Sequence, residues 1–553
     1  MAVLHGSTVR WETVCRAGAV AATAFLLGCV GMFVYRTRHW PLVNDPALMH
    51  YVVFLMGRGM VPYREIGDIN LPGAYAPEWL SMHLAHLLHL SEAAMWRGMD
   101  FGALLLAGWA TVRIARPWSW FAGVWAGALF ALYHGRDGVG QAGQRDLWVA
   151  VLLLWAVSFL FDAMRCAQGR TQGWRLACFG LFISAACTVK PVVIPFLLLL
   201  TPFLLWEESA RARGRLLVFV AAGFVLPVLG SLAFAERWAA MPALWQVLRV
   251  TLPYHASLGD GTVLQLLGRS TLSSTGKLLI VLLVTGLLAG EWRANFRAFR
   301  THPSDGSVWT GSAERISLAG CVLLGLLSFV MQGKGYPYQR YPYVVFLFLF
   351  AALEFASAVG SSRKPLRIAG VVGFAFGVLF CAPAYLRGVA KARWSMPVSE
   401  METAIRAQAS GDTGRDVRGL DGQVQCLDVV SGCTDALLHL HLREATGTIY
   451  DEFLFPQTPS GWGIPYTGPA PGAPASPAVL IGQGRFRAEL LKHSPRVLIV
   501  SAWLFPQGPG DYRELALWPW FDAYLREHYT LVSQQSFARA ENGPLGFRVY
   551  RWK

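Results

Sequence analysis

Charged side chains are scarce in this sequence. Asp, Glu, Lys and Arg make up 15% of its 553 residues, whereas soluble domains carry about 25%. Hydrophobic residues make up 54%, and the mean hydropathy is +0.39. This balance excludes an ordinary soluble protein and indicates one that spans a membrane. The 22 Trp residues fit the same class, because indole rings favour the level of the lipid headgroups.

A continuous basic patch is also absent, although the net charge is +14. The Arg residues lie in short loops between apolar runs, where membrane orientation and anionic lipid headgroups account for them. We therefore expect membrane lipids as partners and no nucleic acid. No small-residue cleavage signature follows the first apolar run, which begins near Ala17, so we expect an uncleaved anchor.

Metal-binding patterns are missing as well. None of the nine Cys residues forms a CxxC pair with metal-site spacing. His83, His86 and His89 recur at three-residue spacing, but no carboxylate or Cys completes a convincing set. A divalent metal is thus possible but unsupported, and no cofactor is predicted. Cys426 and Cys433 are the pair in the polar C-terminal part, where they can form a disulfide if that part lies outside the cytosol.

Long apolar runs dominate the chain up to residue 390. A helix needs about 20 mostly apolar residues to cross a bilayer, and by that criterion we find about eleven runs. They lie at roughly 17–35, 97–114, 118–134, 147–164, 174–189, 191–206, 216–235, 274–290, 316–331, 343–360 and 366–386. Arg10 and Arg16 precede the first run, and every second connection after it carries further Arg residues. The positive-inside rule then places the N-terminus inside and the C-terminus outside.

The segment 74–91 is also long enough to span, but counting it would place all later Arg clusters outside. We interpret it as an amphipathic helix at the interface, like the shorter apolar segment 47–57. The outer connections then include the large first loop 36–96 and the segments 135–146 and 332–342. These connections hold the unusual polar residues, so we expect the protein to act at the outer face.

The composition changes near residue 390. Hydrophobic periodicity beyond this point predicts a mixed set of short elements. They are strands near 424–430, 496–500, 529–533 and 547–552, and helices near 435–444, 485–493 and 520–527. Residues 456–476 form a Pro/Gly-rich loop. The predicted fold is a polytopic α-helical membrane protein, with residues 1–390 as the transmembrane domain and residues 391–553 as a small soluble α/β domain on the outer side.

Asp45 is the first candidate site residue, in the sequence Asn44-Asp45-Pro46. An ionisable group within about ten residues of a membrane run is costly, and is therefore a functional candidate. One interpretation is a helix cap, since Asp followed by Pro is a common helix start. The other is a catalytic acid or base. The two are compatible, because a capping Asp is also rigidly placed.

Four further candidates follow a Gly-x-x-Pro turn in the same loop: Tyr63, Arg64, Glu65 and Asp68. Turn chemistry accounts for them as a solvated loop. The functional alternative is that Arg64 binds a phosphate while Glu65 or Asp68 orients a sugar hydroxyl or a metal.

The second outer loop contains Arg136 and ends in Gln144-Arg145-Asp146. Its glycines do not follow a strand, which argues against a nucleotide-binding loop. Arg145 and Asp146 can form a surface ion pair, and Lys190, before Pro191, can extend to the interface. All four charged residues are also candidates for substrate binding at the outer side.

The most distinctive outer loop runs from Gln332 to Tyr343 and combines glycines, cations and tyrosines. Aromatic belts need Tyr but not this mixture. Lys and Arg are natural partners for a phosphate that leaves with growing negative charge. Lys334, Tyr336, Tyr338 and Arg340 are therefore substrate-binding candidates, with an aromatic belt and turn as the alternative.

Together these features resemble the GT-C superfamily of integral-membrane glycosyltransferases. They are an early outer-loop acid, a Gly-x-x-Pro-Tyr-Arg-Glu turn, alternating long spans, a Lys-Pro helix corner and a Lys-Gly-Tyr-Pro-Tyr loop. The resemblance covers roughly residues 15–390. It is nearest to bacterial relatives of dolichyl-phosphate-mannose–protein mannosyltransferase and of the lipid A aminoarabinose transferase.

The resemblance implies a polyprenyl-phosphate-linked sugar donor, a catalytic Asp in the first outer loop and inversion at the anomeric carbon. Asp45 takes the catalytic position, and Lys190, Lys334 and Arg340 become candidates for the donor phosphate. Protein mannosyltransferases have an acidic pair where Asp45 stands alone between Asn44 and Pro46, which weakens a protein acceptor. The Trp-Trp-Asp signature of oligosaccharyltransferases is absent from the sequence.

The function expected from the sequence is therefore an enzyme of a bacterial inner membrane. It transfers a sugar from a polyprenyl phosphate to a hydroxyl of a glycan, lipid or protein at the outer face, with Asp45 as base. A transporter or flippase of lipid-linked glycans is an alternative, but it should carry charges near the middle of several spans. A non-catalytic membrane scaffold is the third possibility.

Overall fold

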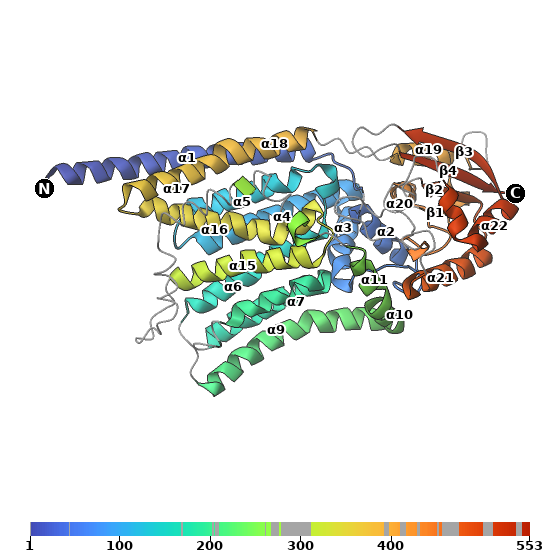
Figure 1. The fold of residues 1–553 in the computed structure, drawn as a ribbon, viewed down its shortest axis with the longest axis horizontal. Helices are drawn as coiled ribbons and strands as arrows, with labels where there is room; N and C mark the ends of the chain where they lie inside the picture. Colours follow the sequence, from blue (N-terminus) through green and yellow to red (C-terminus); the bar gives the residue numbers. More distant parts are fainter. Residues whose placement is uncertain are drawn as a thin grey trace. The chain divides into compact units, whose positions relative to one another are not determined.

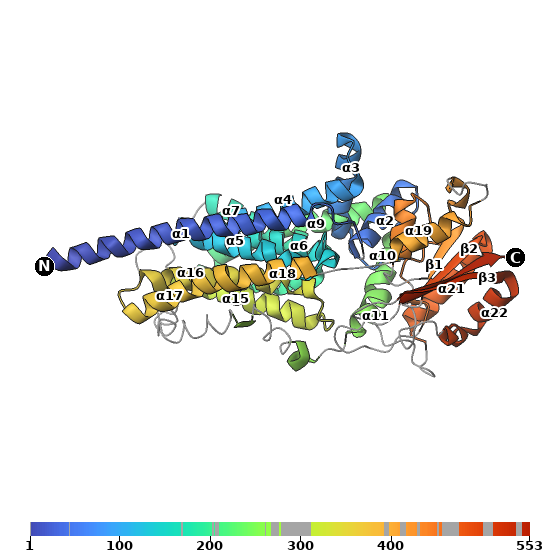
Figure 2. The same cartoon turned by 90° about the horizontal axis from the view of Figure 1, so that it is seen from above.

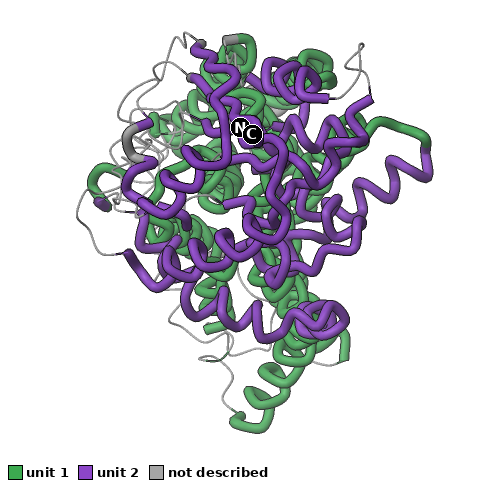
Figure 3. The backbone as a smooth tube through the Cα atoms, turned by 90° about the vertical axis from the view of Figure 1, so that its right-hand side faces the viewer, with its two compact units in different colours: residues 1–40, 89–229, 263–393 green, residues 41–88, 230–262, 394–553 purple. Residues whose placement is uncertain are grey.

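The computed structural model describes most of the chain. The described residues are 2–43, 45–166, 170–201, 204, 209–259, 262–266, 276–277, 311–391, 397–409, 416–427, 432–450, 453–455, 475–501, 512–537 and 545–553. They divide into two compact units, which Figure 3 colours separately. Unit 1 comprises residues 1–40, 89–229 and 263–393, and unit 2 comprises residues 41–88, 230–262 and 394–553. The predicted span 274–290 and the loop 456–476 lie almost entirely outside the described residues.

Unit 1 is a bundle of long helices that run side by side (Figures 1 and 2). Its helices are α1 (Ala2–Thr37), α4 (Glu92–Ala115), α5 (Trp120–Gly135), α6 (Arg145–Met164), α7 (Arg170–Val189), η3 (Pro191–Leu200), α9 (Ala210–Arg237, whose last turns belong to unit 2), α15 (Gly311–Met331), α16 (Tyr341–Gly360), and the consecutive α17 (Lys364–Phe376), η6 (Gly377–Cys381) and α18 (Ala382–Lys391). The 3-10 turns η2 (Val139–Gln141) and η5 (Pro337–Arg340) lie in the loops before α6 and α16.

Six helices in the described part of the chain are long and apolar enough to cross a membrane. They are Thr13–Thr37, Arg145–Met164, Ala210–Arg237, Glu314–Met331, Pro337–Gly360 and Lys364–Ala390. The predicted runs 97–114, 118–134 and 174–189 also lie on helices, namely α4, α5 and α7. The run predicted at 191–206 has the tighter 3-10 form over Pro191–Leu200, where Pro195 lacks the N–H of an α-helical bond. The count of about eleven spans stays a prediction.

Glycine permits the close packing of α4 against α5. A Cβ atom on Gly123 would lie 2.4 Å from the Cα of Val112, and one on Gly127 would lie 2.8 Å from the Cα of Gly108. Thr111 lies in the same contact and donates a hydrogen bond from Oγ1 to the carbonyl of Gly123 at 3.0 Å. Small residues and such bonds are how helices associate inside a bilayer, where burial of apolar surface contributes little.

Unit 2 combines short helices with one sheet. Its helical elements are α2 (Asp45–Gly57), η1 (Pro72–Ala74), α3 (Tyr75–Leu88), α10 (Met241–Gln246), η4 (Val247–Thr251), α11 (Leu252–Ser257), α19 (Val398–Arg406), η7 (Arg418–Leu420), α20 (Cys433–His439), α21 (Pro477–His493), η10 (Arg513–Leu517) and α22 (Pro519–His528). The helices α2 and α3 lie where short helices are predicted at 47–57 and 74–91. The amphipathic character expected for 47–57 is wrong, because every side chain from Pro46 to Met56 is buried.

The sheet has four strands in the order β1-β2-β4-β3. β1 (Val424–Leu427) pairs in parallel with β2 (Val497–Ser501). β4 (Leu545–Trp552) pairs antiparallel with both β2 and β3 (Tyr529–Phe537). The four strands lie near the segments predicted at 424–430, 496–500, 529–533 and 547–552. The continuous burial of β1 and β2 matches their parallel pairing at the core.

Aromatic side chains from α21 and α22 pack onto this sheet. Phe486 of α21 and Phe521 of α22 join Leu498 of β2 and Tyr550 of β4 in one buried cluster around Trp518. Large rings dominate the energetics of such cores because each buries a large apolar area. The sheet and its helices therefore share a hydrophobic core inside unit 2.

The helix predicted over 435–444 is wrong at its C-terminal end. α20 ends at His439, and His441 adopts a left-handed backbone with a φ of 54°, which is incompatible with continuing the helix. The chain then passes beside β1, where the N–H of Ala445 donates to the carbonyl of Val424 at 2.8 Å. The segment 442–444 is consequently extended and in contact with the sheet.

Candidate functional site

Asp45 is the first residue of α2 and is followed by Pro46. The side chains from Pro46 to Met56 are all buried, whereas Asp45 itself is half-buried. The helix therefore starts where the Asn-Asp-Pro sequence predicts it. This arrangement presents the carboxylate on the end of a helix that is immobilised by packing along its whole length.

Tyr63 lies in a strained turn of the same unit. Its φ is 63°, a left-handed value that bulky side chains rarely adopt. The Tyr63 hydroxyl donates to the carbonyl of Asn70 at 2.8 Å, and the guanidinium of Arg485 donates to the Tyr63 carbonyl at 3.2 Å. Strain of this kind is kept where surrounding contacts over-determine the backbone, and it clusters at functional sites.

Arg64 and Glu65 form an exposed ion pair next to Tyr63, with Nη2 of Arg64 3.0 Å from Oε1 of Glu65. Glu65 also accepts a hydrogen bond from the N–H of Val61 at 2.9 Å. Burial alone would raise the pKa of Glu65, but the bonds from Val61 and Arg64 outweigh it and lower the pKa below its usual value. Glu65 is thus a carboxylate at neutral pH.

Asp68 is buried and belongs to the structure of this turn. Its Oδ1 accepts hydrogen bonds from the main-chain N–H groups of Ile69 and Asn70 and from Nδ2 of Asn70, at 2.6, 3.1 and 2.7 Å. Its Oδ2 accepts one from the hydroxyl of Tyr75 at 2.6 Å. A carboxylate with three donors in its own turn and a fourth on α3 orders the turn, a role that the sequence did not single out.

In unit 1 the structure brings Lys190, Asp146 and Tyr338 together. The Lys190 Nζ lies 2.6 Å from Oδ1 and 2.8 Å from Oδ2 of Asp146. The same ammonium lies 5.7 Å from the centre of the Tyr338 ring, within reach of a cation–π interaction. Tyr336 stacks on Tyr338, with ring centres 5.5 Å apart. Three segments that are distant in sequence therefore meet around one ammonium group.

The loop before α16 contains the other two cationic candidates, Lys334 and Arg340. Gly333 and Gly335 have φ values of 64° and 69°, a conformation that favours glycine on either side of Lys334. The N–H of Tyr336 donates to the side-chain carbonyl of Gln339 at 3.2 Å. Arg340 is buried, with its guanidinium carbon 5.8 Å from the Phe329 ring centre. The candidates Lys334 and Arg340 thus belong to one ordered loop.

The remaining sequence candidates in unit 1 lie elsewhere in the loop 135–146. Arg136 forms two hydrogen bonds with Asp137, at 3.1 and 2.8 Å, and lies over the ring of Tyr133. Arg145 is the first residue of α6, directly before the buried Asp146. Arg136 therefore has a local ion pair, whereas Asp146 extends to Lys190.

A buried polar network, which the sequence patterns do not predict, lies next to this loop. Arg97 forms an ion pair with Asp100, and Nε2 of His134 lies 3.0 Å from Oδ2 of Asp100. The Nδ1 of His134 lies 2.9 Å from the hydroxyl of Tyr341, which lies 3.1 Å from Oε1 of Gln141. The available signal was Arg97 and Asp100 at three-residue spacing in an apolar run. The network connects α4, α5, the loop and the start of α16.

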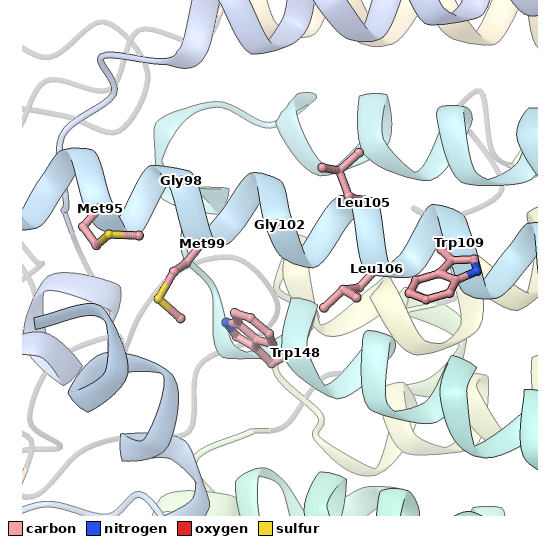
Figure 4. A pocket seen from close by; sticks show the side chains of 8 residues that line it. All are labelled: Met95, Gly98, Met99, Gly102, Leu105, Leu106, Trp109 and Trp148. Atoms are coloured by element: carbon pink, nitrogen blue, oxygen red, sulfur yellow. The ribbon is translucent and has the colours of Figure 1, made fainter. Parts of the chain in front are cut away.

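An apolar groove opens along α4 (Figure 4). Its volume is about 630 Å³. Its lining residues are Met95, Gly98, Met99, Gly102, Leu105, Leu106, Trp109 and Trp148. Leu105 and Trp109 are exposed in the absence of a bilayer. Such a lining suits hydrocarbon and offers no charged group to a ligand.

Metal ligation finds little support in the described part of the chain. There, no three His, Cys, Asp or Glu side chains lie close enough together to hold a metal ion. Of the three histidines at regular spacing, His83 bonds to the carbonyl of Trp79 at 2.8 Å and packs on its ring at 3.8 Å. His83 thus makes local contacts with Trp79 on the same helix, α3.

Neither family models nor curated proteins match this chain by sequence. Solved structures do match. Apo ArnT from Cupriavidus metallidurans has a TM-score of 0.51 and 13% identity over 99% of this chain and 98% of that chain. The archaeal oligosaccharyltransferase AglB from Archaeoglobus fulgidus, in complex with an inhibitory peptide and a dolichol-phosphate, has a TM-score of 0.52 and 11% identity over 95% and 74%.

The apo form of the Archaeoglobus fulgidus oligosaccharyltransferase gives a TM-score of 0.50, with 12% identity over the same shares of the two chains. At these identities the similarity concerns the fold, and it extends over both units. The chain has the fold of the GT-C superfamily of integral-membrane glycosyltransferases.

Proposed function

We propose that this protein is a glycosyltransferase that moves a sugar from a polyprenyl-phosphate carrier to an acceptor hydroxyl, with inversion at the anomeric carbon. The observation that carries the proposal is the Lys190 ammonium, held between Asp146 and the Tyr338 ring in a chain of the GT-C fold. The AglB structure of the same fold holds a dolichol-phosphate. A lipid phosphate is the anion that a cation at the end of a membrane helix would meet.

Asp45 is the proposed general base. Its half-buried carboxylate at the start of α2 accepts the proton of the acceptor hydroxyl as that oxygen attacks the anomeric carbon. The bond from the anomeric carbon to the phosphate oxygen breaks, and its electron pair stays on the phosphate. A single displacement of this kind inverts the anomeric centre and needs one positioned base and a stabilised leaving group.

Cations stabilise the departing phosphate in this proposal. Lys190, Lys334 and Arg340 supply positive charge, and Tyr336 and Tyr338 supply hydroxyl groups and ring surface. The loop that leads into α6 and the first turn of that helix contribute three more charged residues to this proposed site, namely Arg136, Arg145 and Asp146. In unit 2, Tyr63, Arg64, Glu65 and Asp68 are proposed to order the first outer loop or to contact the sugar. No metal or other cofactor is part of this proposal.

We further propose a bacterial inner-membrane location with the reaction on the periplasmic side. The disulfide between Cys426 and Cys433 supports an oxidising compartment for residues 391–553, the proposed soluble domain. The Arg-rich connections between the helices lie on the other side of the membrane in this proposal, which the positive-inside rule identifies as the cytoplasmic side.

The test is transfer by the purified full-length protein in nanodiscs, with a panel of radiolabelled undecaprenyl-phosphate-linked pentoses and hexoses. We expect release of undecaprenyl phosphate and a loss of at least a hundredfold in rate for Asp45→Asn, the scale of general base catalysis. Glu527→Gln, an exposed acid on α22, is the control that keeps its rate. Full activity of a folded Asp45→Asn protein would refute Asp45 as the base, and movement of intact donor across sealed vesicles would favour a transporter.

A further inference from the structure

After its first residue, Asp45, the helix α2 is apolar except at two adjacent positions. From Pro46 to Met56 every side chain is buried, and His50 and Tyr51 are the polar ones. A buried polar group must find a partner, because leaving it without one costs more than a hydrogen bond stabilises. The partners of these two side chains therefore restrict the position and the rotation of the helix.

Tyr51 joins α2 to the extended segment after α20. Its hydroxyl donates to the carbonyl of Leu442 at 3.0 Å and accepts from the N–H of Glu444 at 2.8 Å. Burial, reinforced by the nearby Glu444 carboxylate, raises the pKa of Tyr51 well above its usual value. The hydroxyl consequently stays protonated and uses both its donor and its acceptor on main-chain groups.

Glu444 joins this segment to the sheet. Its Oε1 accepts from Nε2 of Gln425 at 2.7 Å and from the N–H of Cys426 at 2.9 Å. Gln425 in turn accepts from the N–H of Thr446 at 2.9 Å. All of these groups lie in the buried part of unit 2, so the contact made by Tyr51 is anchored in β1 and not in a solvated loop.

His50 makes the second contact. Its Nδ1 lies 3.1 Å from Oε2 of Glu78 on α3, and both side chains are buried. Adjacent residues on a helix point about 100° apart. Contacts at His50 and Tyr51 therefore hold α2 from two directions, which opposes both rotation about its axis and sliding along it.

We propose that Tyr51 and Glu444, together with His50 and Glu78, are positioning residues that set the register of α2 and thereby the location of Asp45. This inference rests on the proposed role of Asp45 as base. Apolar contacts alone tolerate small slips, whereas buried polar pairs are the best-attested devices for fixing helix register. A shift of one residue moves a helix by about 1.5 Å, and displacement of a catalytic group by about 1 Å can cost a hundredfold in rate.

The first test measures α2 directly, without any turnover. Hydrogen–deuterium exchange of the full-length protein in nanodiscs is compared for wild type and Tyr51→Phe, which removes one hydroxyl and keeps the ring. We expect the amides of residues 45–57 to exchange about tenfold faster in the variant. Tyr529→Phe is the matched control, since it deletes a buried hydroxyl that donates to the carbonyl of Pro495 at 2.7 Å in the same unit.

The control is expected to leave α2 exchange unchanged. Glu78→Gln keeps the shape of the side chain but weakens its contact with His50, and it tests the second contact in the same way if Tyr51→Phe does not fold. Unchanged α2 exchange in both variants overturns the positioning proposal, whatever Asp45 does.

The second test asks whether the register matters for transfer. Rates with the undecaprenyl-phosphate sugar panel are expected to fall at least tenfold in Tyr51→Phe, while binding of undecaprenyl phosphate stays within about twofold. If the amides of α2 exchange faster in Tyr51→Phe but the transfer rate does not fall, the proposed link between the register of α2 and the action of Asp45 is overturned. Failure of the base assignment is recognised separately, by full activity of Asp45→Asn.

Discussion

The ammonium nitrogen of Lys190 lies 2.6 Å from the nearer carboxylate oxygen of Asp146, and this carboxylate is completely buried. Lys190 separates α7 from η3, and Asp146 is in the first turn of α6. A buried carboxylate is tolerated only with a charged or hydrogen-bonding partner. The pair thus links the polar ends of three helical segments, and the cation that we propose for phosphate binding is also needed for structure.

Replacing Lys190 by Met is expected to destabilise unit 1 by about 3–5 kcal/mol, because Asp146 loses its charged partner while remaining buried. Thermal stability of the protein in detergent micelles measures this effect. The double variant Lys190→Met with Asp146→Asn is expected to recover much of the loss, since no charge is then left buried.

Binding separates the two roles of Lys190. The double variant should remain at least tenfold weaker than wild type for undecaprenyl phosphate in a direct binding assay, because the cation is gone. Wild-type affinity in the double variant would mean that Lys190 acts in structure alone.

Gly123 and Gly102 are expected to differ in their response to the same substitution. Gly123→Ala places a methyl group 2.4 Å from the main chain of α4, so the helices must separate, at a cost of about 1–3 kcal/mol. Gly102→Ala meets no atom within 4 Å, because Gly102 lines the apolar groove. Thermal unfolding in detergent should show a lower midpoint for the first variant and little change for the second, and equal midpoints would contradict the tight α4–α5 contact.

Stability at acid pH should depend on Asp421. Burial alone would raise the pKa of Asp421, but hydrogen bonds from the main chain and side chain of Arg443, at 2.7 and 3.0 Å, outweigh it and lower the pKa. A lowered folded-state pKa stabilises the fold above the unfolded value of about 4, and this contribution is lost as the pH falls through the folded value.

Asp421→Asn should therefore be less stable than wild type at pH 7, with the difference shrinking as the pH approaches about 3. Chemical denaturation of the full-length protein between these pH values measures it. Asp416→Asn is a useful comparison, because its side chain is 74% exposed and contacts Arg418 at 4.0 Å. A constant difference across the pH range would exclude the Asp421–Arg443 bonds as its source.

Reduction of the disulfide should loosen the junction between β1 and α20. Cys426 and Cys433 are seven residues apart, and closing so short a loop stabilises the folded chain by roughly 2 kcal/mol in the chain-entropy model. Faster amide exchange in residues 424–427 and 433–439 after treatment with a phosphine reductant is the expected result.

The double variant Cys426→Ser with Cys433→Ser should show the same fast exchange with and without reductant. The cysteines outside this pair are free thiols, so reduction has no other target among them. A reductant effect that persists in the double variant would therefore contradict the assignment to this bond.

The sequence determined the features that depend on local periodicity. Long apolar runs mark the helices of unit 1, short apolar segments after residue 390 mark the four strands, and Asn-Asp-Pro marks the start of α2 at Asp45. These patterns are readable because a helix or strand repeats its burial every few residues. The resemblance to GT-C enzymes rests on the order of such features and is confirmed at the level of the fold.

Tertiary structure alone decided which polar groups meet. Asp146 pairs with Lys190, His134 meets Asp100, and Tyr51 reaches Glu444 across 393 residues of chain. The spacing of polar residues does not predict such partners, because they are selected when helices pack and buried charges need compensation. For the same physical reason, the start of α2 at Asp45 could be predicted from three letters of sequence, while the contacts that hold this helix appear only in the folded unit.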